Sequence, residues 1–151
     1  ALVRDTLTLM EHDLQRDGIS VEVVERSSMP SFYGVKLEMQ QVLINLISNA
    51  AQSISAAIPE RRLVTIILDS PGYSDHLSIA VRDTGHGLIS DIQQKIFTPF
   101  FTTKETGMGM GLAFCRSAVE AIGGTLEGKN HPDGGALFEI RLPKDAVDVR
   151  T

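Results

Sequence analysis

The chain has 151 residues and a formal net charge of −5. That length suits a single domain with a hydrophobic core, and the acidic balance argues against nucleic acid as a partner. Cys115 is the only cysteine, which excludes a disulfide framework and a cysteine-based metal site. No apolar run reaches membrane length and no signal peptide is visible, so we expect a cytoplasmic domain, whether or not its parent protein is membrane-anchored. The helical pattern starts at once from Ala1, without a methionine, so we also expect a piece of a longer protein.

The first third of the chain predicts a helix, a strand and a second helix. Apolar residues at helical spacing run through about Arg16, and Asp17-Gly18 ends that helix. Partial alternation from Ile19 to Glu25 predicts a strand in which Ile19, Val21 and Val23 share a face. The second helix, about Val35 to Ala57, carries one apolar stripe made of Met39, Val42, Leu43, Leu46, Ile47, Ala50 and Ile54.

Asn45 and Asn49 lie one turn apart on a flank of that stripe. Asn is a mediocre helix former, so a pair beside the buried face needs an explanation. One alternative is that both side chains satisfy neighbouring backbone groups. The other, which we favour for the pair, is contact with a ligand and a metal ion, because an amide oxygen can ligate Mg²⁺ alongside phosphate oxygens and water.

The middle of the chain predicts an antiparallel hairpin that ends in a buried carboxylate. Its strands run from Leu63 to Leu68 and from Leu77 to Arg82, with a turn region between them. Period-two alternation places Asp83 on the same apolar face as the second strand's buried residues. Such a carboxylate needs a donor, either from the following turn or from a ligand N–H such as an exocyclic amino group. The motif alone leaves both alternatives open.

Two glycine clusters follow, Gly85-His86-Gly87 and Gly107-x-Gly109-x-Gly111. Exposed backbone N–H groups in such loops form anion sites, so this stretch predicts a pocket for a phosphorylated ligand, with Lys104 as a nearby cation. Between the clusters we expect a short helix from Asp91 to about Phe97, then packing anchors and a mobile lid over residues 102–110. The anchors are Phe100 and Phe101, and His86 is interpreted as an exposed loop residue.

A third helix begins at Gly111 or Leu112 and ends at Gly123-Gly124, with Cys115 as core filler. Residues 125–127 and 136–142 predict the last strands, separated by a turn through Asn130 and Asp133-Gly134-Gly135. We therefore place one domain over residues 1–143 and a C-terminal tail over residues 144–151.

Common phosphate-binding templates do not fit. The second cluster is not G-x-G-x-x-G and does not follow a strand, and no G-x-x-x-x-G-K-[ST] is present, so neither a dinucleotide fold nor a P-loop is expected. The chain also lacks H-E-x-x-H and G-x-S-x-G.

The order of the motifs is distinctive: Asn-x-x-x-Asn-Ala on a helix, Asp-x-Gly-x-Gly after a strand, Phe-x-Pro-Phe-Phe, then Gly-x-Gly-x-Gly-Leu opening a helix. From about Leu2 to Pro143 the chain resembles the ATP-binding catalytic domain of bacterial sensor histidine kinases, which belong to the GHKL superfamily. Asn-Leu-Ile-Ser-Asn-Ala-Ala-Gln-Ser and Phe-Thr-Thr-Lys-x-x-Gly-Met-Gly-Met-Gly-Leu look most like the oxygen- and nitrogen-sensing type.

The resemblance implies an α+β fold, a two-layer α/β sandwich of the Bergerat type. A mixed, mostly antiparallel sheet is covered on one face by helices. It implies that Asp83 accepts from the adenine amino group, that Asn49 binds Mg²⁺, and that Asn45, Asn49 and Lys104 form the catalytic set. The implied nucleotide contacts are Asn49, Gln52, Asp83, Gly85, Gly87, Leu88, Thr103, Lys104, Gly107, Met108, Gly109, Met110, Gly111 and Leu112.

The implied function is to bind ATP with Mg²⁺ and donate its γ-phosphate to a histidine on a separate dimerisation domain, for relay to an aspartate of a response regulator. ATP or ADP, that domain and the regulator are the expected partners, and the fragment alone is expected to be a monomer. The phosphoacceptor histidine is expected outside this fragment, since His12 lacks the expected proline after it. Two alternatives are an anti-sigma-type serine kinase on the same fold and a non-enzymatic nucleotide-binding interaction module.

Asn45 carries a further implication. In the ATP-hydrolysing relatives of this fold a Glu stands at this position as general base, and an amide cannot take a proton from water. We therefore expect negligible ATPase activity.

Overall fold

The structure is a computed structural model that describes residues 2–27, 36–57, 61–72, 74–85 and 111–143. The predicted helix at 91–97, the Phe100-Phe101 anchors, the lid and the tail lie outside the described residues. So do these predicted site residues: Gly87, Leu88, Thr103, Lys104, Gly107, Met108, Gly109 and Met110.

The described residues form three helices and five strands. In chain order they are α1 (Leu2–Arg16), β1 (Ser20–Glu25), α2 (Lys36–Ala57), β2 (Leu63–Asp69), β3 (His76–Arg82), α3 (Gly111–Ala121), β4 (Thr125–Asn130) and β5 (Ala136–Pro143).

The strands form one mixed sheet in the order β1-β2-β3-β5-β4. β2 and β3 pair antiparallel, as the hairpin prediction requires, and β3 and β4 each pair antiparallel with β5. β1 pairs parallel with β2, because the helix α2 carries the chain back between them. β3 is therefore the central strand, and the residue that follows it lies between the beginnings of β2 and β5.

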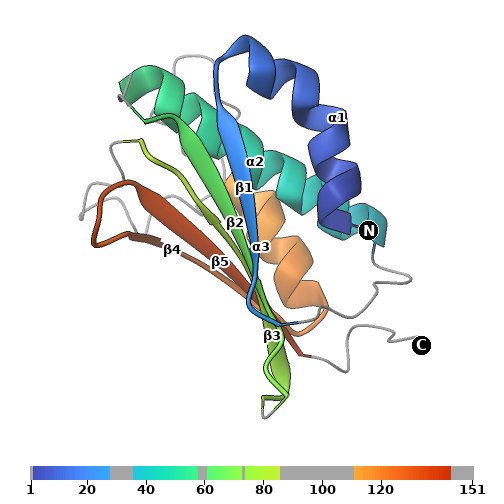
Figure 1. The fold of residues 1–151 in the computed structure, drawn as a ribbon. Helices are drawn as coiled ribbons and strands as arrows, with labels where there is room; N and C mark the ends of the chain where they lie inside the picture. Colours follow the sequence, from blue (N-terminus) through green and yellow to red (C-terminus); the bar gives the residue numbers. More distant parts are fainter. Residues whose placement is uncertain (1, 28–35, 58–60, 73, 86–110, 144–151) are drawn as a thin grey trace.

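The helices form a layer on one face of the sheet (Figure 1). α2 is the centre of that layer, since it packs against α1, α3, β2 and β3. Every residue of its predicted apolar stripe is buried, with at most 2% of its surface exposed. Facing residues of the central strands, such as Ile66, Ile79 and Ile140, complete the core. The predicted two-layer α+β architecture is confirmed.

Two details differ from the sequence prediction. Val23 shares the apolar face of the predicted strand with Ile19 and Val21, yet it is 43% exposed, because β1 is an edge strand. β4 continues to Asn130, beyond the predicted end at Glu127, because its polar residues pair through their backbone with the start of β5. Backbone pairing leaves no apolar pattern in the sequence at that end of the strand.

The predicted helix ends are confirmed. α1 stops at Asp17-Gly18, and α3 stops at Gly123-Gly124, where the N–H of Gly123 donates to the carbonyl of Glu120 and the N–H of Gly124 to that of Val119. Within the described part of the chain, no helix combines the length and apolar character needed to cross a membrane.

Candidate nucleotide-binding site

Asp83 follows the central strand β3, and its side chain lies inside the protein, with 1% of the residue exposed. Its Oδ1 atom accepts hydrogen bonds from the N–H of Gly85 at 2.8 Å and from the N–H of Ala136 at 3.3 Å. Its own N–H donates to the carbonyl of Ala136 at 3.0 Å. These backbone donors offset the cost of burying a carboxylate and fix its orientation. The alternation argument for a buried Asp83 is thus confirmed.

The turn after Asp83 is tied to the beginning of β2. The Thr84 hydroxyl donates to the carbonyl of Arg61 at 2.6 Å and accepts from the N–H of Leu63 at 3.1 Å. Thr84 therefore joins β2 to the turn that carries Asp83.

The same turn touches α2. A Cβ atom on Gly85 would overlap the Ser53 hydroxyl oxygen and lie 3.0 Å from the Ser53 carbonyl carbon. Ser53 lies four residues after Asn49, which lies four residues after Asn45, so all three share one flank of α2. The structure thus brings the asparagine flank to the Asp83–Gly85 turn, as a shared ligand site requires.

The asparagines are half-buried, whereas Gln52 is exposed. Asn45 is hydrogen-bonded to the thiol of Cys115 on α3. The buried Cys115 Sγ also lies 3.8 Å from the carbonyl oxygen of Val42. Burial raises the pKa of this thiol to about 11, and the bond with Asn45 acts in the opposite direction. Cys115 is a neutral core residue at physiological pH, as predicted.

On the third helix, Gly111 is the first residue of α3, and Leu112 is half-buried against the core. The sequence prediction missed four residues that shape the Asp83 environment: Ser53, Thr84, Gly135 and Ala136. Asp133-Gly134-Gly135 was interpreted only as a turn. Nothing in its local pattern shows which distant residue the turn contacts.

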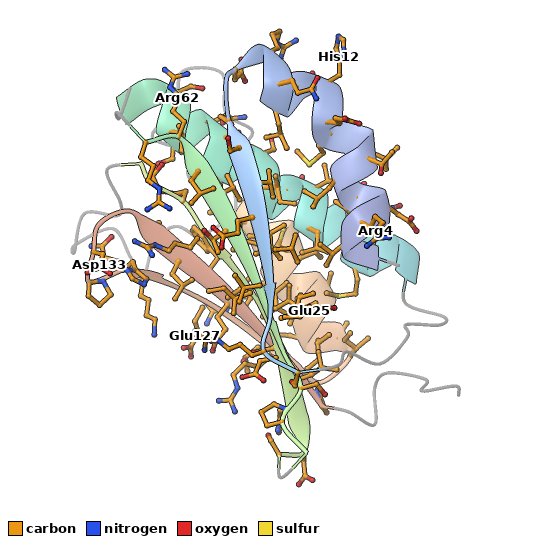
Figure 2. All side chains as sticks on the ribbon, viewed as in Figure 1. Arg4, His12, Glu25, Arg62, Glu127 and Asp133 are labelled. Carbon is orange, nitrogen blue, oxygen red and sulfur yellow. The ribbon has the colours of Figure 1, made fainter. Side chains whose placement is uncertain are left out.

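His12 lies in the C-terminal half of α1, and its side chain points away from the molecule (Figure 2).

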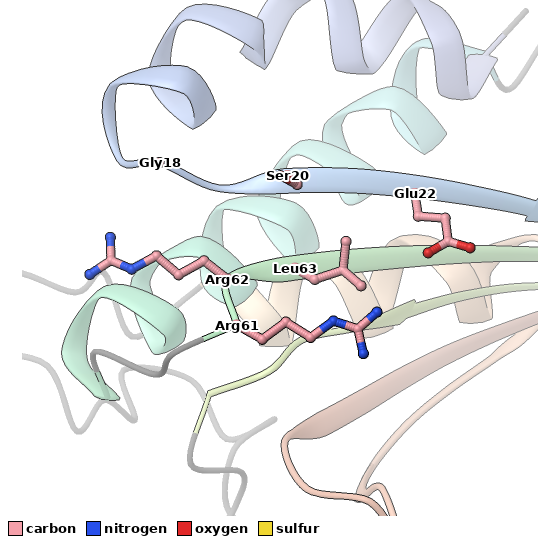
Figure 3. A pocket seen from close by; sticks show the side chains of 6 residues that line it. All are labelled: Gly18, Ser20, Glu22, Arg61, Arg62 and Leu63. Carbon is pink, nitrogen blue, oxygen red and sulfur yellow. The ribbon is translucent and has the colours of Figure 1, made fainter.

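An open hollow of about 390 Å³ lies at the beginnings of β1 and β2 (Figure 3). None of the predicted site residues lines it, and its lining contains both the Glu22 carboxylate and the Arg61 guanidinium. Arg62 is the second cation of this lining, and its Nη1 atom already donates a hydrogen bond to the carbonyl of Asp17 at 2.6 Å. The lining residues are Gly18, Ser20, Glu22, Arg61, Arg62 and Leu63.

Comparison with known proteins agrees with the motifs and the fold. A family described as "Histidine kinase-, DNA gyrase B-, and HSP90-like ATPase" matches residues 34–146. The chain is 35% identical over 143 residues to sensor histidine kinase TmoS from Ectopseudomonas mendocina, which covers 95% of this chain and 15% of TmoS. It is 34% identical over 142 residues to sensor protein TdiS from Thauera aromatica, covering 94% of this chain and 26% of TdiS. The chain thus spans only a small part of these relatives.

Solved structures give the same result. The catalytic domain of histidine kinase ThkA superposes with a TM-score of 0.81 at 27% identity, covering 95% of this chain and 90% of that domain. Full-length ShkA in complex with AMPPNP superposes with a TM-score of 0.82 at 25% identity, covering 99% of this chain and 30% of ShkA. The chain therefore belongs to the histidine kinase-, DNA gyrase B- and HSP90-like ATPase family. Within it, the chain groups with the ATP-binding domains of sensor histidine kinases, as its motifs predict.

Proposed function

We propose that this domain binds ATP at the Asp83 turn and donates the γ-phosphate to a histidine on a separate dimerisation domain of its parent protein. The phosphate then passes to an aspartate of a response regulator. Positioning and charge neutralisation supply most of the catalysis in such transfers. Named sensor histidine kinases among the relatives support this proposal over the serine-kinase and interaction-module alternatives.

The observation that carries the proposal is the buried Asp83 carboxylate. Two backbone N–H groups hold Oδ1, so the carboxylate has a fixed direction at the end of the central strand. A fixed anionic acceptor suits the exocyclic amino group of adenine, and a hydrogen bond to a charged group contributes about 1.5–3 kcal/mol.

Magnesium fits the donor chemistry of α2. Among the described residues no group of three or more His, Cys, Asp and Glu side chains could hold a metal ion. Asn49 offers an amide oxygen, and Mg²⁺ commonly takes few protein ligands while phosphate oxygens and water fill the rest. We assign Asn49 as the protein ligand, and the ion would supply charge neutralisation at the phosphates.

The remaining assignments follow from the same proposal. Residues 1–143 form a cytoplasmic catalytic domain, and residues 144–151 form its tail. In isolation from its parent protein, the domain is a monomer. The nucleotide is contacted by the described site residues and by eight further residues: Gly87, Leu88, Thr103, Lys104, Gly107, Met108, Gly109 and Met110. ThkA has been solved in complex with the response regulator TrrA, which supports a regulator as partner.

Thermal unfolding with ADP or ATP, with and without Mg²⁺, tests the binding step on wild type, Asp83→Asn and Asp133→Asn. Asp133 is the matched control because its side chain is 79% exposed at the outside of the nearby β4–β5 turn (Figure 2). Nucleotide at a hundred times its dissociation constant should stabilise wild type and the control by about 2.7 kcal/mol. Asp83→Asn should lose most of that shift. Equal shifts in all three proteins would contradict the assignment of Asp83.

The transfer step is tested by adding the parent protein's dimerisation domain together with labelled ATP. A phosphohistidine label is lost in mild acid and stable in base. A label that survives acid would instead indicate transfer to serine.

A further inference from the structure

We propose that Gly135 is a positioning residue for base recognition: the β4–β5 turn holds the backbone of Asp83 and thereby aims its carboxylate at the exocyclic amino group of adenine. This inference rests on the proposed function, because it assigns a second element to the same site. It predicts that discrimination between purine bases depends on a residue about fifty positions away from Asp83 in the chain.

The turn has a defined backbone geometry. The N–H of His131 donates to the carbonyl of Gly135 at 2.9 Å, and the N–H of Gly134 donates to the carbonyl of His131 at 3.0 Å. The N–H of Asp133 donates to His131 Nδ1 at 3.0 Å. Gly134 and Gly135 both have positive φ, 101° and 81°, which other residues rarely adopt. Backbone strain alone would therefore penalise a side chain at either position.

Contact with Asp83 distinguishes the two glycines. A Cβ atom on Gly135 would overlap the carbonyl oxygen of Asp83 and would lie 2.9 Å from its carbonyl carbon and 3.2 Å from Oδ1. A Cβ atom on Gly134 would meet nothing within 4 Å. Of these two glycines, only Gly135 is therefore needed for the close packing of the turn against Asp83.

Hydrogen bonds next to this contact link the position of the turn to the orientation of the Asp83 carboxylate. Ala136, the next residue, both accepts from the Asp83 N–H and donates to Oδ1, and the Gly85 N–H holds the same oxygen. A side chain at Gly135 must move Asp83, Ala136 or both, and either movement reorients the carboxylate. A general loss of folding would weaken the binding of all nucleotides alike. A misaligned carboxylate weakens the binding only of those nucleotides that donate a hydrogen bond to it.

Calorimetric titration with ADP and with purine riboside diphosphate, which lacks the exocyclic amino group, separates these effects. Wild type should prefer ADP by about 10- to 100-fold, as expected for a hydrogen bond to a charged acceptor. Gly135→Ala should bring this ratio close to one, chiefly through weaker ADP binding. Gly134→Ala, the matched control, should keep the wild-type ratio even where its thermal stability falls.

The outcomes are separable. If wild type binds neither nucleotide, the proposed function is wrong and the inference falls with it. If wild type and Gly134→Ala discriminate and Asp83→Asn does not, but Gly135→Ala keeps the full ratio, the inference alone is overturned.

A second measurement on wild type does not depend on the folding of any variant. In ¹⁵N-labelled protein the amide signals of Gly85, Gly135 and Ala136 should shift on binding ADP and shift clearly less on binding purine riboside diphosphate. Equal shifts with both ligands would overturn the proposal.

Discussion

At the scale of single residues, Cys115 couples folding to pH. Its thiol is buried between α3 and α2, and burial raises its pKa from 9.0 to about 11. In the unfolded chain the thiol ionises near pH 9, while the folded protein keeps it neutral. The contribution of this thiol to the free energy of unfolding is therefore fully present below pH 9. As the pH rises toward 11 the protein loses up to about 2–3 kcal/mol of stability.

Urea unfolding between pH 8 and pH 11 checks this prediction. Tyrosines and lysines also titrate in this range, so the informative quantity is the difference in slope between wild type and Cys115→Ala. The variant should start less stable, because its core is underfilled, but should lose stability less steeply. Parallel curves would show that the thiol does not contribute.

At the scale of elements, the junction between α3 and β5 limits which residue can follow the helix. A Cβ atom on Gly124 would lie 2.5 Å from the carbonyl oxygen of Arg141, 2.7 Å from Cδ2 of Leu142 and 2.9 Å from Cγ1 of Val119. Because one obstacle is backbone, the helix must move away from the strand. We expect Gly124→Ala to lower the free energy of unfolding by about 1–3 kcal/mol, as overpacking does.

Chemical denaturation measures this loss, with Gly72→Ala as the control. Gly72 lies in an exposed turn where a Cβ atom would meet nothing within 4 Å. The control should stay within about 0.5 kcal/mol of wild type. A Gly124→Ala protein as stable as the control would contradict the close packing of this junction.

Elements with one strong local period were predictable from sequence. The stripe of α2 repeats along a single helix, and the alternation of β3 places Asp83 correctly. The edge strand β1 was less predictable, because Val23 follows the alternation and is still exposed. Its parallel pairing with β2 depends on how α2 crosses the sheet, which no local pattern encodes.

Contacts across the chain were the least predictable part of the site. The alternation of its own strand predicted Asp83, but the contacts that hold its turn come from elsewhere in the chain. Thr84 hydrogen-bonds to the beginning of β2, Ser53 on α2 packs against Gly85, and Gly135 packs against Asp83. Positive-φ glycines in a turn look the same in sequence whether or not a distant carboxylate packs on them. The nucleotide ligand was predicted from the family resemblance, whereas the residues that pack around Asp83 became known only from the fold.

At the scale of the whole molecule, the domain is expected to keep its phosphate for transfer. Asn45 stands where ATP-hydrolysing relatives are expected to carry a Glu, and its amide is hydrogen-bonded to Cys115. An amide cannot act as general base toward water. We therefore predict that the isolated domain with ATP and Mg²⁺ releases phosphate no faster than buffer alone.

A coupled phosphate assay measures this rate on wild type and on Asp83→Asn prepared in parallel. The pairing identifies contamination, because a foreign ATPase would give the same rate in both preparations. Release that is present in wild type and absent in Asp83→Asn would come from this site and would contradict the prediction. A domain that holds ATP without hydrolysing it can commit the phosphate to a protein acceptor, which is what the proposed transfer to a separate histidine requires.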